Sequence, residues 1–170
     1  KTETTPSRPV RIVVIGAGNR AHKYLEYARR NPEQLRLAAI VEVNDLRRRA
    51  MADAFGLPDK YCYAHYDDFF AERLDADMVL ISTPENAHFD PAVKAIDAVL
   101  LEKPIAQRLD ECREIARCAR RRGVLVGVCH VLRYHPYFAK IRELVASGRL
   151  GHVVSVNHTA SVGLDRATHS

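Results

Sequence analysis

Two glycines separated by one residue follow the first apolar run of the chain. Val10–Ile15 has the composition of a buried strand, positions 16–21 read GAGNRA, and a helical pattern continues from there. This is the G-x-G-x-x-A fingerprint in the strand, turn and helix setting that dinucleotide binding requires. Gly16 would allow the tight turn, and Gly18 would let the backbone approach a pyrophosphate at the partially positive helix N-terminus. A purely structural turn is the alternative, but the motif predicts cofactor contacts at Gly16, Gly18, Asn19 and Arg20.

An acidic residue, Glu42, stands at the end of the second apolar run, 26 residues after Gly16. A carboxylate at this place can accept the ribose hydroxyls of an adenosine and repels a 2′-phosphate, which favours NAD over NADP. NADP stays open because three arginines follow, although successive helix residues point in different directions: Arg47, Arg48 and Arg49. Methyltransferases that use S-adenosylmethionine carry the same turn and carboxylate. These residues alone therefore predict an adenosine-bearing cofactor and leave the reaction undefined.

The elements that must position these motifs are visible as short apolar runs that alternate with helical patterns. Continuous apolar runs are typical of strands buried on both faces of a parallel sheet. Five strands are predicted: Val10–Ile15, Leu37–Val41, Met78–Ser82, Val99–Leu101 and Val124–Cys129. Helices are predicted at Arg20–Arg30, Asp45–Phe55, Glu85–Ala98 and Asp110–Arg122, the last with Asp110 as N-cap and Gly123 as its stop. This order predicts an α/β fold with a doubly wound parallel sheet.

The composition excludes several other classes of protein. The 170 residues are 47% apolar and 28% charged, as in an ordinary folded domain and unlike a disordered or disulfide-stapled chain. No apolar run approaches the roughly 20 residues of a membrane span, and no secretory leader is visible. A net charge of +5 does not predict a nucleic-acid partner, because aromatic residues do not interleave with the basic ones. Four cysteines without C-x-x-C spacing favour free thiols in a reducing cytoplasm, and no ligand cluster predicts a metal site.

The pattern changes after Cys129, so we expect a nucleotide-binding domain over residues 8–130 and the start of a second domain over 131–170. A helix is predicted over Pro136–Ala146, and a strand over Val153–His158, whose alternation indicates one solvated face. A lone strand cannot bury its apolar side. We therefore expect the chain to be part of a larger working molecule.

Two further motifs follow the predicted strands Met78–Ser82 and Val99–Leu101. They read STPENAH at 82–88 and EKP at 102–104, and both lie at the carboxyl edge, where doubly wound sheets bind ligands. With them the chain, from about Val10 to Gly163, resembles the Gfo/Idh/MocA family, named after glucose-fructose oxidoreductase and inositol dehydrogenase. The resemblance implies an NAD(P)-dependent dehydrogenase that transfers hydride between a nicotinamide and a sugar, inositol or related polyol. It also implies a second α/β domain for substrate and dimer contacts, hence a homo-oligomer at full length.

The resemblance also assigns roles to individual residues. Lys103 matches the E-K-P lysine near the nicotinamide and the substrate hydroxyl, where it would handle a proton or orient the substrate. An exposed surface lysine is the alternative. Glu102 would bind near the nicotinamide ribose or hold Lys103. The segment that runs along the cofactor would comprise Ser82, Thr83, Pro84 and His88.

Further candidates lie towards the C-terminus. Arg133, Tyr134 and His135 fall where the family's interdomain hinge meets substrate, although packing of the hinge by the tyrosine is an equal alternative. Asp165 and His169 have the spacing of a catalytic Asp-x-x-x-His pair, with His169 as general base. A second alignment, on a Val-Gly-x5-His-Ser stretch, leaves His169 as the one candidate there.

One feature departs from the family pattern. The predicted helix Glu85–Ala98 runs into the strand Val99–Leu101 without a stop, where the family has a short connection. We therefore expect residues to be missing between Ala98 and Val99. The alternative function is a dinucleotide-binding regulator of the same fold without turnover, and the intact E-K-P motif favours the enzyme.

Overall fold

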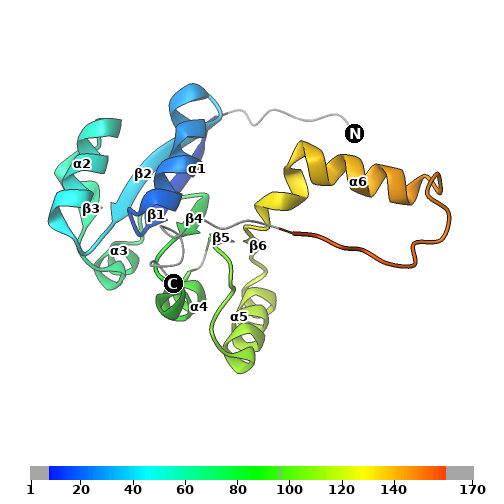
Figure 1. The fold of residues 1–170 in the computed structure, drawn as a ribbon. Helices are drawn as coiled ribbons and strands as arrows, with labels where there is room; N and C mark the ends of the chain where they lie inside the picture. Colours follow the sequence, from blue (N-terminus) through cyan, green and yellow to red (C-terminus); the bar gives the residue numbers. More distant parts are fainter. Residues whose placement is uncertain (1–7, 96, 160–170) are drawn as a thin grey trace. The chain divides into compact units, whose positions relative to one another are not determined.

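The computed structural model describes residues 8–95 and 97–159 (Figure 1). The chain divides between His130 and Val131 into two compact units. Each unit is described by itself. The division falls at the predicted domain boundary, and the assignment of residues 131–170 to a substrate domain stays a prediction.

A six-stranded, all-parallel sheet forms the centre of the first unit (Figure 1). In spatial order the strands are β3, β2, β1, β4, β5 and β6. Strands β2 and β3 are therefore added on one side of β1, and strands β4, β5 and β6 on its other side. The predicted doubly wound α/β fold is thereby confirmed. The strands span Val10–Ile15 (β1), Leu35–Val41 (β2), Cys62–Tyr63 (β3), Met78–Ile81 (β4), Ala98–Leu101 (β5) and Val126–Val128 (β6).

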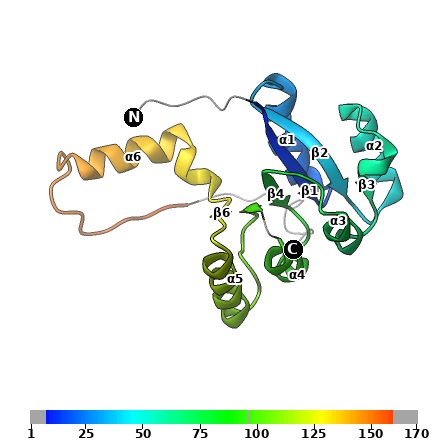
Figure 2. The ribbon, with the colours of Figure 1, turned by 180° about the vertical axis from the view of Figure 1, so that it is seen from behind.

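Helices cover both faces of the sheet because alternate residues of each strand are apolar on opposite faces. Ile12 and Val14 of β1 pack with buried residues of α1 and α2, whereas Val13 and Ile15 pack with those of α3, α4 and α5. The same two groups of helices are visible from behind in Figure 2. Their bounds are Asn19–Arg30 (α1), Asp45–Phe55 (α2), Tyr66–Glu72 (α3), Phe89–Lys94 (α4) and Leu109–Arg122 (α5).

β3 and α3 were not predicted from the sequence, since β3 has two residues and α3 seven, too few to show a clear periodicity. It also made the helix before β5 too long. Residues 85–87 form a short 3-10 helix, α4 ends at Lys94, and Ala95 has extended backbone angles. β5 begins at Ala98 and pairs in register with β4, so Ala98 and Val99 are consecutive residues of one strand and the expected gap between them is not found.

Both ends of α5 have recognisable local causes. Arg108, and not Asp110 as predicted, is the N-cap, and its backbone N–H donates to the Glu111 carboxylate at 3.2 Å. Gly123 adopts a left-handed φ of 69° and stops the helix, as predicted. Arg122 in the last turn donates to the carbonyl of Ala95 at 2.9 Å, which fastens α5 to the connection before β5.

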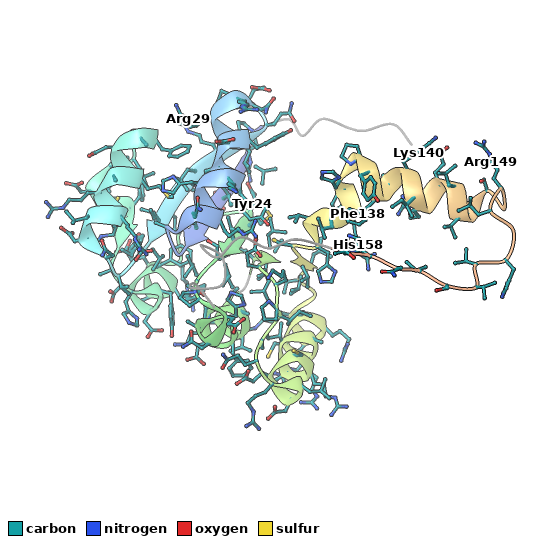
Figure 3. All side chains as sticks on the ribbon, viewed as in Figure 1. Tyr24, Arg29, Phe138, Lys140, Arg149 and His158 are labelled. Carbon is teal, nitrogen blue, oxygen red and sulfur yellow. The ribbon has the colours of Figure 1, made fainter. Side chains whose placement is uncertain are left out.

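The second unit contains a 3-10 turn, Val131–Tyr134, and the predicted helix α6, Pro136–Ala146. Phe138 of α6 packs edge-to-face on His158, with 5.9 Å between ring centroids (Figure 3). The predicted strand Val153–His158 is wrong, because residues 153–159 have no regular secondary structure. The physical reason is that a strand needs a hydrogen-bonded neighbour, and the described part of this unit contains none.

Along the described residues no helix is long and apolar enough to cross a membrane. The four cysteines are free thiols, of which Cys118 and Cys129 are buried.

Candidate functional site

A cavity of about 500 Å³ lies at the carboxyl ends of β1, β2, β3 and β4. It is therefore placed at the point where the strand order reverses, which is where open α/β sheets bind ligands. Four segments that are distant in sequence line it: Ile15, Gly16, Gly18, Val41, Glu42, Val43, Arg47, Ala64, His65, Tyr66, Ser82, Thr83, Pro84 and Ala87.

Gly16 makes the turn from β1 possible in two ways. Its φ of +93° is in the region that residues with a side chain rarely adopt, and a Cβ here would lie 2.8 Å from the amide nitrogen of Thr83. The Ser82 hydroxyl donates to the Gly16 carbonyl at 2.8 Å. Glycine is thus required by the protein itself, because the β1 turn and the β4 loop touch at this residue.

Gly18 is different, because nothing lies within 4 Å of the place its Cβ would take. It is the N-cap of α1, with φ −78°, and makes no side-chain cap. The first amides of a helix have no partner inside the helix, so this end presents N–H groups and a partial positive charge to the cavity side. The packing of the described residues therefore does not require glycine at position 18, and its contact with a cofactor stays a prediction.

Glu42 is 8% exposed, and its carboxylate fixes the cavity wall. One carboxylate oxygen accepts from the Ala17 N–H at 2.7 Å, and the other accepts from the Asn44 N–H at 2.9 Å. Glu42, which is predicted to accept hydrogen bonds from a ribose, therefore holds the glycine turn against the end of β2. Each oxygen retains a lone pair, so both remain able to accept from a hydroxyl of a ligand.

The three arginines that follow have different surroundings, as their helical spacing predicted. Arg48 donates to the Glu42 carbonyl at 2.6 Å and pairs with Asp45, and Arg49 pairs with Asp45 at 3.0 Å. Arg47 is exposed and lines the cavity. The cavity wall therefore includes one carboxylate, from Glu42, and one guanidinium, from Arg47.

A second group of functional side chains follows β5. Glu102 is 6% exposed, accepts from the Tyr24 hydroxyl at 2.7 Å and accepts from the Lys103 N–H at 3.1 Å. Burial, then the neighbouring Cys129 and Glu102, raises the pKa of the Tyr24 phenol well above its ordinary value. Tyr24, which lies on α1 (Figure 3), therefore stays a donor and orients the carboxylate. Burial also raises the pKa of the Cys129 thiol.

Lys103 lies beyond Glu102 with an exposed side chain, and the peptide bond between Lys103 and Pro104 is cis. Glu102 binds the backbone N–H of Lys103, and no ion pair of the Lys103 ammonium is found among the described residues. Glu102 thus contacts the backbone of Lys103, and the roles assigned to the two side chains stay predictions. Its amino group is left at the open carboxyl edge of the sheet.

His88 is 1% exposed and does not line the cavity, although it belongs to the segment predicted to run along the cofactor. Its ring nitrogens lie 2.8 Å from the carbonyl oxygen of Pro104 and 3.0 Å from that of Thr83. Ser82, Thr83 and Pro84 do line the cavity.

Asn19 and Arg20, the first two residues of α1, are exposed and do not line the cavity. The other predicted site residues belong to the second unit or lie near the C-terminus. Arg133 and Tyr134 lie in the 3-10 turn, and His135 is the N-cap of α6, where its ring accepts from the Tyr137 N–H at 3.3 Å. His169 lies outside the described residues. Among the described residues no group of three His, Cys, Asp or Glu side chains could hold a metal ion.

Sequence reasoning missed four contributors to these two groups. Tyr24 sits one helical turn after Arg20, yet only the fold shows that it reaches Glu102 across 78 residues of sequence. The Asn44 N–H gives no sequence signal. His65 and Tyr66 follow β3, a strand that the sequence did not reveal.

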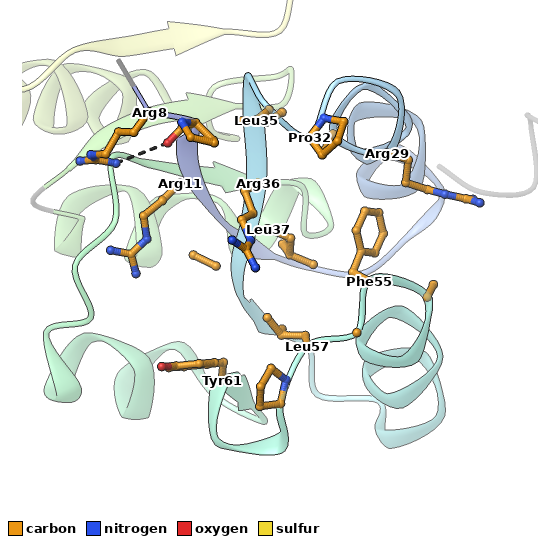
Figure 4. A pocket seen from close by; sticks show the side chains of 16 residues that line it. Arg8, Arg11, Arg29, Pro32, Leu35, Arg36, Leu37, Phe55, Leu57 and Tyr61 are labelled. Carbon is orange, nitrogen blue, oxygen red and sulfur yellow. Dashed lines mark hydrogen bonds between the residues drawn. The ribbon is translucent and has the colours of Figure 1, made fainter. Parts of the chain in front are cut away.

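A larger cavity, of about 800 Å³, lies at the opposite, amino edge of the sheet (Figure 4). Four arginines line it together with apolar side chains such as Leu37 and Phe55: Arg8, Arg11, Arg29 and Arg36. No residue of the glycine turn, of the TPENAH segment or of the EKP motif lines this cavity. The glycine turn, Thr83 and Pro84 line the smaller cavity, and no residue of the EKP motif lines either cavity.

Comparison with known families shows which family the chain resembles. The Gfo/Idh/MocA oxidoreductase family, described as having an NAD-binding Rossmann fold, matches residues 10–130. An uncharacterized oxidoreductase of Rhizobium meliloti is 31% identical over 150 residues, which cover 86% of this chain and 44% of that protein. The D-xylose 1-dehydrogenase (NADP(+)) 2 of Haloferax volcanii is 35% identical over 130 residues, 75% of this chain and 39% of that protein.

Solved structures share the fold. The WlbA dehydrogenase of Bordetella pertussis, in complex with NADH and UDP-GlcNAcA, superposes with a TM-score of 0.79 at 21% identity over 88% of this chain and 43% of that chain. Myo-inositol 2-dehydrogenase of Lactobacillus plantarum gives a TM-score of 0.79 at 18% identity over 86% and 44%. The chain thus spans less than half the length of these relatives. On the family match, the chain belongs to the Gfo/Idh/MocA oxidoreductases, and residues 10–130 form their NAD-binding Rossmann domain.

Proposed function

We propose that the protein containing this chain is an NAD(P)-dependent oxidoreductase that transfers hydride between a nicotinamide and a sugar, inositol or related polyol. The observation that carries the proposal is the juxtaposition, on one sheet edge, of the glycine turn held by Glu42 and the EKP loop held by Tyr24. The relatives named above, a D-xylose dehydrogenase and an inositol dehydrogenase, support the substrate class.

In this proposal the pyrophosphate lies on the N-terminus of α1, beside Gly18, Asn19 and Arg20. The adenosine ribose meets Glu42, whose two oxygens are already oriented by backbone donors. A carboxylate held in this way favours NAD, and Arg47 on the same wall leaves NADP as a second form that the site accepts. Ser82, Thr83 and Pro84 contact the cofactor on the β4 side.

A nicotinamide held at this edge would supply the acceptor for the hydride of the alcohol carbon. The hydroxyl proton must leave at the same time, and Lys103 takes it in its amine form, so that the alcohol becomes a carbonyl and Lys103 an ammonium. In the reverse reduction the ammonium returns the proton. The exposed amino group beyond the Glu102 anchor suits this role, because its backbone is held while its side chain stays free to meet substrate.

Residues 131–170 begin the substrate and dimerisation domain in this proposal, and the working molecule is a homo-oligomer. Arg133, Tyr134 and His135 are the candidates for substrate contact, and His169 is the candidate for a second proton-handling group. These assignments rest on the family pattern.

Calorimetric titration of this chain with NADH, NADPH and S-adenosylmethionine tests the cofactor. We expect binding of NADH, weaker binding of NADPH and none of S-adenosylmethionine, and loss of NADH binding in Gly18→Val. Binding of S-adenosylmethionine alone would instead indicate a methyltransferase.

Turnover is then tested on the complete polypeptide with a panel of sugars, inositols and linear polyols, by following NADH absorbance. We expect reduction of NAD with at least one member, and its loss in Lys103→Ala. Cofactor binding without turnover across the whole panel would favour a dinucleotide-binding regulator.

A further inference from the structure

His88 lies between two loops that the sheet brings close together without joining. β4 and β5 are neighbours, with Ile81 opposite Leu101, and the last backbone hydrogen bond between them runs from the Glu102 N–H to the Ile81 carbonyl at 3.0 Å. Beyond it one loop carries Thr83 and the other carries Lys103. Among the described residues no backbone hydrogen bond connects these two loops.

The imidazole of His88 fills this place. Its Nε2 lies 3.0 Å from the Thr83 carbonyl oxygen, and its Nδ1 lies 2.8 Å from the Pro104 carbonyl oxygen. The side chain is 1% exposed. Since Pro104 directly follows Lys103, one ring spans from the wall of the cofactor cavity to the lysine loop.

Both partners of the ring are acceptors, which limits what else His88 can do. A neutral imidazole has one N–H and satisfies one carbonyl at a time, whereas the imidazolium donates to both. In either form the ring nitrogens face backbone carbonyls, so neither is directed at a cofactor or a substrate. A buried apolar replacement would leave both carbonyls without any donor from this side chain, which is unfavourable for buried acceptors.

We propose that His88 is a positioning residue, which ties Thr83 to Pro104 and thereby sets where Lys103 stands relative to the bound cofactor. The proposal rests on the proposed function for its catalytic consequence. The tie itself is a property of the chain without cofactor, and the two can be tested separately.

The first experiment measures the tie without cofactor, by amide hydrogen exchange in this chain. We expect His88→Leu to lower the protection of the Glu102 and Lys103 amides at least about tenfold. Tyr63→Phe is the matched control, because it removes another partly buried hydrogen bond, from Tyr63 to Glu72 at 2.6 Å. It should leave these two amides unchanged. Unchanged protection in His88→Leu, or equal loss in the control, overturns the proposal.

Two isosteric variants keep the test informative if His88→Leu does not fold. The amide nitrogen of Asn lies close to the place of Nδ1 and that of Gln close to the place of Nε2, so H88N retains the donor to Pro104 and H88Q the donor to Thr83. Each variant should give a loss of protection smaller than that of His88→Leu. Wild-type protection in both H88N and H88Q would show that the ring joins nothing.

The second experiment uses the complete polypeptide and separates binding from turnover. A misplaced reacting group lowers kcat by about 10- to 100-fold, so we expect such a loss in H88N and H88Q, with Kd for NADH within about threefold of wild type. A loss confined to Kd, or an unchanged kcat, overturns the positioning role. If the wild type binds NADH and turns over nothing, the proposed function fails, whereas the exchange result still decides whether the tie exists.

Discussion

Two cavities lie at opposite edges of the sheet, and the larger one lacks the motif residues that line the smaller one. The one at the amino edge holds about 800 Å³, and the one at the carboxyl edge about 500 Å³. The smaller one adjoins a helix N-terminus and the buried carboxylate of Glu42, whereas four arginines and apolar side chains line the larger one. The volume of a cavity therefore does not indicate a ligand site. What indicates one is the meeting of helix N-termini with the carboxyl ends of parallel strands.

Glycines at the two edges make the same point. At Gly16, on the carboxyl edge, the amide nitrogen of Thr83 lies 2.8 Å from the place that a Cβ would take, so two loops touch there. Gly56, which lines the larger cavity, has φ +59° and nothing within 4 Å of a Cβ, so it serves as the stop of α2. One glycine permits a close contact, and the other ends a helix.

The largest effect is expected from Gly16→Ala. A Cβ 2.8 Å from the Thr83 amide nitrogen, at φ +93°, forces the turn and the β4 loop apart. We expect a loss of about 1–3 kcal/mol in the free energy of unfolding and a loss of NADH binding of more than about 100-fold. Urea denaturation and calorimetry measure the two. Wild-type stability would show that the contact is not close in solution.

Gly18→Ala separates cofactor approach from folding. Because a Cβ here meets nothing within 4 Å, we expect the free energy of unfolding to change by less than about 0.5 kcal/mol. NADH affinity should nevertheless fall more than about tenfold, since the methyl group occupies the approach of the pyrophosphate. Unchanged NADH affinity in calorimetry would remove Gly18 from the site.

Glu42→Gln tests the carboxylate that distinguishes the smaller cavity. An amide group faces one of the two N–H donors with its own NH₂, so one hydrogen bond, to Ala17 or to Asn44, is lost. We expect about a tenfold loss of NADH affinity and a smaller loss for NADPH, because the charge that repels a 2′-phosphate is gone. Equal losses for both cofactors would contradict this role of the charge.

A smaller effect is expected at the amino edge from Asp77→Asn. Arg8 and the Arg11 N–H hold the pKa of the Asp77 carboxyl below its ordinary 3.8. Since the folded-state pKa is the lower one, the stabilisation is complete above that ordinary value and is lost as the pH falls through the folded-state value. Urea denaturation at pH 7 should show that the free energy of unfolding falls by less than about 1 kcal/mol. The difference between wild type and variant should shrink steadily as the pH falls below 3.8; a difference that stays constant on acidification would exclude this cause.

The smallest expected effect is that of Arg36→Glu in the larger cavity. It reverses a charge at the amino edge while leaving every contact of the smaller cavity in place. NADH affinity should stay within about twofold of wild type. A tenfold change would mean that the two edges are coupled, which would break the comparison.

The sequence by itself determined the parallel α/β fold and the main motif residues. Each depends on short-range patterns: the apolar run Val10–Ile15, the GAGNRA turn after it, the acidic Glu42 and the EKP triplet. Strand and helix ends were right where a local stop exists, as at Gly123. They were wrong where tertiary contacts decide, as at Lys94, where α4 ends before β5 pairs in register with β4.

Only the tertiary structure decided how the motifs are joined. Tyr24 on Glu102, Glu42 on Ala17 and His88 on two carbonyls are contacts between residues 5 to 78 positions apart. No periodicity encodes such pairs, because each side chain alone is compatible with many partners. They form when a parallel sheet places the carboxyl ends of its strands at one edge, where burial makes every unpaired polar group costly.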